Sequence, residues 1–253
     1  MNVQIRTASF GRGLGWLTDG LGYFTKNPLG WIAAMIVVFL IMIVIGVIPL
    51  GSLLLYIVYP VFVGGFMLGC KAHAAGQQFE FQHAFAGFSA DYLKRLLLFG
   101  VFYAILNLMM LVVIMLLLFV LLGGLDFFQQ MQTVQPGDLG QFATELSLIV
   151  LIASLLFLPL IMLSWFAPAL LVNTDCSPAQ AMLLSFKACL YNIPAFTLYG
   201  VVIILLGILA TIPLGLGFLI FMPVMLASVH LAFLDCFTVA DSSGPAELAQ
   251  TIE

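Results

Sequence analysis

Charge is what this sequence has least of. Of its 253 residues, 7% are charged and 64% are hydrophobic. A soluble domain carries about 25% charged residues, so this chain has too few charged side chains to form a water-exposed surface. Its mean hydropathy of +1.22 indicates that lipid is its solvent. The seven Lys and Arg residues are also too few and too dispersed to form a nucleic-acid-binding surface.

Cysteine is scarce as well, and the strand-like alternation of polar and apolar residues is absent. The four cysteines, Cys70, Cys176, Cys189 and Cys236, are too scattered for the disulfide framework of a small secreted protein. The missing alternation argues against a transmembrane β-barrel. The first apolar run begins near Leu29, too late for a cleavable signal peptide, so we expect the N-terminus to be retained.

Long apolar runs are abundant, and the chain contains six of them. They span residues 29–48, 52–72, 95–123, 143–172, 195–212 and 215–234. A helix needs about 20 apolar residues to cross the hydrocarbon core of a bilayer, and it satisfies its backbone hydrogen bonds internally. We therefore predict an all-α integral membrane protein with six transmembrane helices.

The basic residues predict the orientation of these spans. An even number of spans places both termini on one side of the bilayer, here called side A. All seven basic residues then lie on side A, whereas the 124–142 loop on the other side contains Asp126 and Asp138 and no Lys or Arg. Cytoplasmic loops are enriched in Lys and Arg, so we expect side A, with both termini, to face the cytoplasm.

The tetrapeptide Ile-Pro-Leu-Gly occurs twice, at 48–51 and at 212–215. Each copy joins two apolar runs, and an asparagine precedes the first run of each pair, Asn27 in one case and Asn192 in the other. Proline ends a helix and glycine lets the chain reverse, so each copy predicts a tight helical hairpin. The matched landmarks indicate a duplicated unit.

The middle of the chain has the same order of features without this turn, which suggests a third, diverged copy. We expect one transmembrane domain, 1–239, made of units 8–75, 76–173 and 174–238, and a disordered acidic tail, 240–253. Each unit would be a helical hairpin preceded by an interfacial amphipathic helix, and the three hairpins would share one orientation. Such parallel repeats argue against an inverted-repeat transporter.

The segments that join the spans on side A carry apolar and aromatic residues at helical spacing. In the first segment these residues are Phe10, Leu14, Leu17, Leu21 and Phe24. We expect such helices to lie in the headgroup plane with this face toward lipid. They either anchor the spans alone or bind lipid or a partner protein.

Few polar groups fall inside the spans. Asn107 is the one amide well inside a span, and His230 is the titratable side chain nearest to the membrane interior. Both either form interhelical hydrogen bonds or line a pathway together with Pro60 and Pro223. These prolines are expected to kink the return helices and to free carbonyl groups there.

No motif of a metal site, cofactor site or catalytic centre is present. Cys70 and His73 have Cys-x-x-His spacing at the end of a span, but no second pair accompanies them, and a zinc site needs three or four ligands. We predict no cofactor, no metal and no enzymatic activity.

Two longer segments resemble known sequences. GQQFEFQHAFAGFSADYLKRLLLFG and SWFAPALLVNTDCSPAQAMLLSFKACLYN are similar to segments of the YciC-like and related six-span families of bacterial integral membrane proteins, whose function is unknown. The resemblance implies six helices and a location in the bacterial inner membrane. It supplies no catalytic residues to carry over.

These observations favour a non-enzymatic, multi-pass inner-membrane protein that acts as an accessory or scaffold. Its expected partners are membrane lipids and either further copies of itself or other membrane proteins. The first alternative is a passive transporter or channel for a small apolar or lipid-like solute. The second is an enzyme acting on lipid headgroups, with His73, Glu80, His83 and Asp235 as its polar groups.

Overall fold

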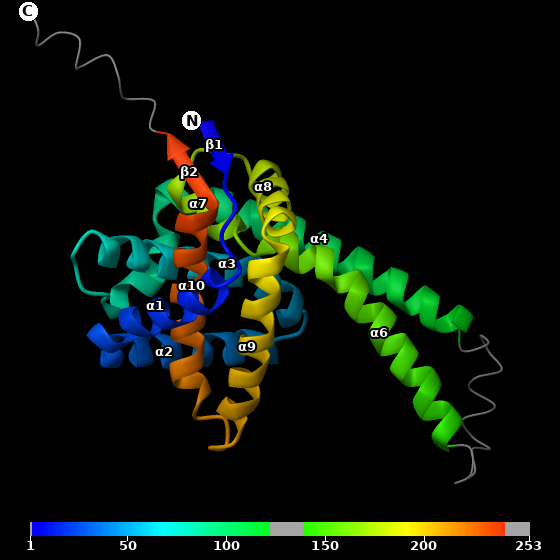
Figure 1. Cartoon of the computed structure of the whole chain (residues 1–253). Coiled ribbons are helices and arrows are strands. Elements are labelled where there is room, and N and C mark those ends of the chain that lie inside the picture. Colours follow the sequence, from blue (N-terminus) through cyan, green and yellow to red (C-terminus); the bar gives the residue numbers. More distant parts are fainter. Residues whose placement is uncertain (1, 122–138, 241–253) are drawn as a thin grey trace, which may run out of the picture.

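The computed structural model describes residues 2–121 and 139–240, and its helices and strands are drawn in Figure 1. In chain order they are β1 (Asn2–Ile5), α1 (Arg12–Lys26), α2 (Pro28–Val47), α3 (Gly51–Ala74), the 3-10 helix η1 (Phe81–Phe88), α4 (Ala90–Leu121), α6 (Leu139–Ser164), α7 (Ala167–Asn173), α8 (Pro178–Tyr191), α9 (Ile193–Thr211), α10 (Phe218–Cys236) and β2 (Phe237–Ala240). The predicted loop at 124–142 and the predicted tail fall largely or wholly outside the described residues.

Within the described residues, six helical segments are long and apolar enough to cross a membrane. They are α2, α3, α4, α9, α10 and the segment Ser147–Asn173, which joins most of α6 to α7. The prediction of an all-α polytopic membrane protein with six spans is confirmed. Since an even number of spans returns the chain to its starting side, the antiparallel pairing of β1 with β2 is consistent with this count.

The two Ile-Pro-Leu-Gly turns both hold their leucine in the left-handed conformation. Leu50 has φ 63° and Leu214 has φ 55°, and in the described residues no other non-glycine residue has a positive φ. This left-handed conformation costs about 1–2 kcal/mol for a residue with a Cβ. Gly51 must be glycine for another reason, because a Cβ there would collide with the carbonyl of Ile45. A strained leucine therefore occurs at the same position of both turns. The turns differ elsewhere, because Ile48 is extended whereas Ile212 is helical, and Gly215 has a positive φ.

The short helix that precedes each hairpin packs against the hairpin before it. α8 packs against α6 and α7, and η1 packs against α3. α1 has no earlier hairpin and instead packs against α10, the last span. The β1–β2 pair, from Asn2 opposite Ala240 to Ile5 opposite Phe237, joins the same two ends of the chain (Figure 1). The order of contacts thus closes into a ring. Whether the three units arose by duplication stays a prediction.

Small residues make these contacts close. A Cβ on Gly13 would meet the backbone of Ala195 in α9, and one on Gly20 would meet the backbone of Val224 in α10. In η1, Gly87 lies against the backbone of Val61 in α3 in the same way. In α8, small residues again lie on the buried face, among them Ala181, Ser185 and Ala188.

This packing corrects the expected orientation of the first side-A segment. Trp16, Leu17 and Phe24 are buried against protein, whereas Leu14 and Leu21 are exposed. The expected stripe is therefore divided between two faces of α1. The reason is that Gly13 and Gly20 select the face that approaches α9 and α10, and a sequence pattern based on hydrophobicity alone does not count glycine.

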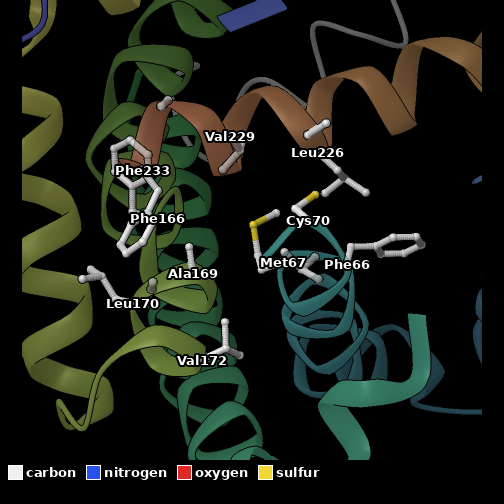
Figure 2. Close-up of a cluster of buried hydrophobic side chains, with 14 of the residues drawn as sticks. Phe66, Met67, Cys70, Phe166, Ala169, Leu170, Val172, Leu226, Val229 and Phe233 are labelled. Atoms are coloured by element: carbon white, nitrogen blue, oxygen red, sulfur yellow. The ribbon is translucent and has the colours of Figure 1, made fainter. Parts of the chain in front are cut away.

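The return helices α3, α7 and α10 form the centre of the protein. Figure 2 shows Met67 and Cys70 of α3, Leu170 of α7, and Leu226 and Val229 of α10 in one buried apolar cluster. In their most apolar stretches, 56% of α3 and 50% of α10 is buried, against 17% of α2 and of α9. The outgoing helices therefore form the lipid-facing wall around this centre.

The α4–α6 hairpin differs from the other two. It projects away from the rest of the protein (Figure 1), and 11% of the most apolar stretch of each of its two spans is buried. We call this hairpin the arm.

Candidate functional site

The junctions between units are held by side chains that donate to backbone carbonyls. Asn27 Nδ2 donates to the carbonyl of Phe79, at 2.7 Å, just before η1. Asn192 Nδ2 donates to the carbonyl of Arg6, at 3.0 Å, just before α1. Asn192 Oδ1 also accepts from the Ala8 N–H. Each asparagine therefore ties the start of its own hairpin to the segment that leads into the next short helix.

The middle unit uses an arginine for the same purpose. Arg95 Nη1 donates to the carbonyl of Thr174, at 2.7 Å, in the segment before α8. The same atom lies 3.7 Å from Asp175 Oδ1. Asn27 and Asn192 were recognisable in the sequence from their matched positions, but Arg95 was not, since it lies inside α4 rather than at its start.

A charged cluster fastens α1 to the end of α10. Arg12 Nε donates to Asp235 Oδ2 at 2.7 Å, and Trp16 Nε1 donates to the same oxygen at 2.8 Å. Arg12 Nη1 also contacts Asp19 Oδ2 at 3.2 Å. The hydrogen bond to Asp235 is the largest cause of the raised pKa of Arg12. Asp235 therefore has a structural role in closing the ring.

A pocket of about 500 Å³ with a mixed polar and apolar lining, here called the polar pocket, lies between β1 and α8. It is lined by Val3, Thr174, Asp175, Cys176, Gln180, Leu183, Leu184 and Lys187. Lys187 is exposed, and the side chain of Asp175 is 81% exposed. Burial raises the pKa of the Cys176 thiol, so this cysteine stays protonated at neutral pH and is a poor nucleophile.

An apolar groove of about 380 Å³ lies beside this pocket. It is lined by Phe102, Ile105 and Leu106 of α4, Leu163 of α6, and Ala179, Met182 and Leu183 of α8. Leu183 borders both the groove and the polar pocket. The two cavities therefore meet at α8, one polar and one apolar.

The four residues predicted to lie near a pathway have separate environments. Asn107 Nδ2 donates to the carbonyl of Tyr103 in its own helix, and within the described residues no hydrogen bond joins its amide to another helix. His230 is 1% exposed, and neither of its ring nitrogens has a hydrogen-bond partner. Pro60 and Pro223 are buried in α3 and α10. In the described part of the chain, no hydrogen bond joins any two of these four residues.

A hydrogen bond between the side chains of two spans was not predicted. The hydroxyl groups of Tyr199 in α9 and Ser228 in α10 lie 2.7 Å apart. Tyr and Ser are too common in apolar spans to mark such a contact in advance. Only the adjacency of the two helices reveals it.

Of the four groups considered for an enzyme, Glu80 and His83 contact each other, whereas His73 and Asp235 have other neighbours. His83 Nδ1 accepts from the Glu80 N–H at 2.8 Å. The centres of the His73 and Tyr23 rings lie 4.3 Å apart, with the two rings tilted by 49°. Asp235 is bound by α1, as described above. Within the described residues, no group of three or more His, Cys, Asp or Glu side chains could hold a metal ion.

Comparison with known proteins gives one similar chain. A probable inner membrane protein of Burkholderia thailandensis is 27% identical over 267 aligned residues, which cover 96% of this chain and 97% of that protein. The alignment runs nearly from end to end, and the six apolar helices agree with the location in its name. The chain is a multi-pass inner-membrane protein.

The similarity is to an inner-membrane protein in general and gives no support to the YciC-like families in particular. No family model matches the chain. No solved structure matches it either.

Proposed function

We propose that this inner-membrane protein is a non-enzymatic structural component that binds other membrane helices through the α4–α6 arm. The observation that carries the proposal is the contrast in burial: about half of α3 and α10 is buried inside the chain, but 11% of each span of the arm. Helices associate in lipid by close packing and not by the hydrophobic effect. A hairpin that its own chain leaves uncovered on most sides is therefore available to a partner.

The side chains exposed on the arm give it a surface that can adapt to a partner. Met109 and Met115 of α4 are 59% and 58% exposed, and Leu155 of α6 is 61% exposed. Methionine is flexible and polarizable, and it is common on surfaces that accept more than one partner. A second copy of this chain and a different membrane protein are both compatible with this surface.

Cysteine crosslinking in native membranes tests the proposal. In a variant whose four cysteines are replaced by alanine, Met115→Cys and Leu155→Cys are each treated with a short bifunctional maleimide. Ile208→Cys on α9 is the matched control, since Ile208 is 59% exposed. We expect adducts of higher mass from the two arm positions and none from Ile208. Equal crosslinking at all three positions, or none at any, would reject a role of the arm in assembly.

We further propose that the termini face the cytoplasm. A count of six spans assigns all seven basic residues to the same side of the bilayer as the two termini, and the positive-inside rule favours the cytoplasm for this side. Ser9→Cys should react with a membrane-impermeant maleimide only after lysis, whereas Leu214→Cys at the opposite hairpin tip should react in intact cells with a permeabilised outer membrane. The reverse pattern would invert the topology.

The apolar groove beside α8 favours passive transfer of a lipid-like solute as a second candidate function. The centre of the protein does not favour a channel, because side chains of α3, α7 and α10 fill it (Figure 2). Transfer along the groove would take place at the surface of the arm. It predicts that a purified chain in vesicles accelerates the flip of a fluorescent phospholipid, which a scaffold alone would not do.

A further inference from the structure

We propose that the polar pocket and the apolar groove on the two sides of α8 form one binding site for a phospholipid whose headgroup carries a primary amine. This site does not depend on the scaffold role of the arm. The chemistry required is a phosphate next to an ammonium group, attached to acyl chains, as in phosphatidylethanolamine.

The spacing of residues on α8 places the two cavities on neighbouring faces of this helix. Gln180, Leu184 and Lys187 recur every three or four residues and face the polar pocket, whereas Ala179 and Met182 face the groove. Residues three and four apart lie on one face of a helix, so these are two neighbouring faces. Leu183 lies on the boundary and lines both cavities.

The order of the cavities matches the order of parts in a lipid. The polar pocket is bordered by Val3 of β1, on the side of the protein where the two termini pair. The groove is bordered by Phe102 and Ile105 of α4 and by Leu163 of α6, all within candidate membrane spans. A headgroup in the pocket would therefore leave its acyl chains directed along the arm. Both volumes lie within the range of about 300–1,000 Å³ that is typical of ligand pockets.

The charges in the pocket select the headgroup. Lys187 has no ion-pair or hydrogen-bond partner in the described residues, and an ammonium group of this kind binds phosphate as a point charge. Asp175 is paired only with Arg95, at 3.7 Å, and most of its side chain is exposed. A headgroup with both a phosphate and a primary amine satisfies Lys187 and Asp175 together. The phosphate of an anionic lipid without the amine would bind Lys187. The Asp175 carboxylate would then face the negative charge of the lipid.

Other occupants explain less of the site. Free phosphate would use only the polar pocket and would not account for the groove. A partner helix would cover the groove and would not account for the pair of opposite charges beside it. Phosphatidylcholine has a quaternary ammonium, which cannot donate a hydrogen bond to Asp175.

The experiment measures lipid retention by native mass spectrometry on the delipidated full chain. The probes are phosphatidylethanolamine, phosphatidylglycerol and phosphatidylcholine with identical acyl chains, and inorganic phosphate. We expect phosphatidylethanolamine to bind most tightly. Lys187→Gln should weaken its binding about tenfold, or about 1.4 kcal/mol, because it removes the ammonium group that binds the phosphate. Asp175→Asn should remove the preference over the other two lipids and leave their binding unchanged or stronger.

Matched variants separate the site from general effects of charge and bulk. Lys94→Gln removes another exposed lysine of side A and should change nothing. Ala179→Trp should fill the groove and weaken all three lipids, whereas Ala90→Trp, at an exposed alanine outside the groove, should not. All five changes are at exposed positions, and thermal unfolding of each variant checks that the fold is intact.

The proposal is overturned if Lys187→Gln retains phosphatidylethanolamine like the parent chain. It is also overturned if the parent chain binds the three lipids equally, or if inorganic phosphate alone competes fully with the lipid. Either of the last two results would show that the pocket does not specifically bind a lipid with a primary amine.

Discussion

The return helices and the arm are made of similar apolar residues but have opposite relations to the rest of the chain. In α3 and α10, glycine, alanine and serine bring neighbouring helices to within backbone contact. In the arm, large side chains such as Leu116 and Leu155 point away from the protein. The difference teaches that hydrophobicity places a helix in the membrane, whereas small residues decide which helices pack inside one chain.

The largest expected effect contrasts a buried aromatic residue with an exposed leucine of the arm. Phe66→Ala removes a side chain that is 2% exposed, which should lower the free energy of unfolding by about 3–5 kcal/mol. Leu155→Ala, at a position 61% exposed, should change it by less than about 0.5 kcal/mol. Unfolding of both variants in mixed micelles measures the pair. Similar losses would mean that the arm is packed as tightly as the centre.

The next effect tests whether the glycines of α3 are required by close contact. Gly65→Ala places a Cβ against the carbonyls of Ala84 and His83 in η1, and such overpacking should cost about 1–3 kcal/mol. Gly200→Ala has no atoms within 4 Å of the new Cβ and should be neutral or stabilise α9 by up to about 1 kcal/mol. The melting temperatures of the two variants should therefore move in opposite directions. An equal fall in the melting temperature of both variants would contradict the inference that close contact with η1 requires glycine at position 65.

A smaller effect is expected from the carboxylate that joins α1 to α10. Asp235→Asn weakens the bonds from Arg12 and Trp16, and we expect a loss of about 1–2 kcal/mol in the free energy of unfolding. Asp19→Asn is the control, since it touches only Arg12 and its side chain is 47% exposed. High salt should reduce the Asp235 effect only in part, because Trp16 is uncharged. No difference between the two variants would mean that Asp235 does not hold the ring closed.

The smallest effect concerns the strained hairpin tips. Leu214 is 96% exposed and has a positive φ, so Leu214→Gly removes little packing and relieves strain. After the entropy that glycine adds to the unfolded chain, we expect a gain of about 0.5–1 kcal/mol. Leu216→Gly, also exposed but without a positive φ, should give no gain. If both changes destabilise equally, the tip is not strained.

The spans and the turns could be predicted from the sequence because their causes are local. The run at 29–48 corresponds to Pro28–Val47, and the run at 215–234 to Phe218–Cys236. Apolar length determines a span, and the Ile-Pro-Leu-Gly order determines its turn. None of these signals depends on a neighbour that is distant in sequence.

The packing and the binding site could not be predicted in the same way. The role of Gly13 depends on α9 lying beside α1, and the bond from Arg95 depends on Thr174, 79 residues away. Lys187 could be recognised as basic, but that it lines one pocket together with Asp175, next to an apolar groove, depends on how α8 packs against the arm. These features follow from contacts between units, which hydropathy and turn residues do not specify.

The central claim is that the three units close into a ring, so that the first and last segments of the chain meet on one side of the membrane. A disulfide between Val3→Cys and Val239→Cys, which are opposite each other in the β1–β2 pair, tests it most directly. In a background without native cysteines, mild oxidation of membranes should give an intramolecular crosslink in nearly all molecules, and neither single variant should form it. Only intermolecular dimers, or no crosslink at all, would contradict the account.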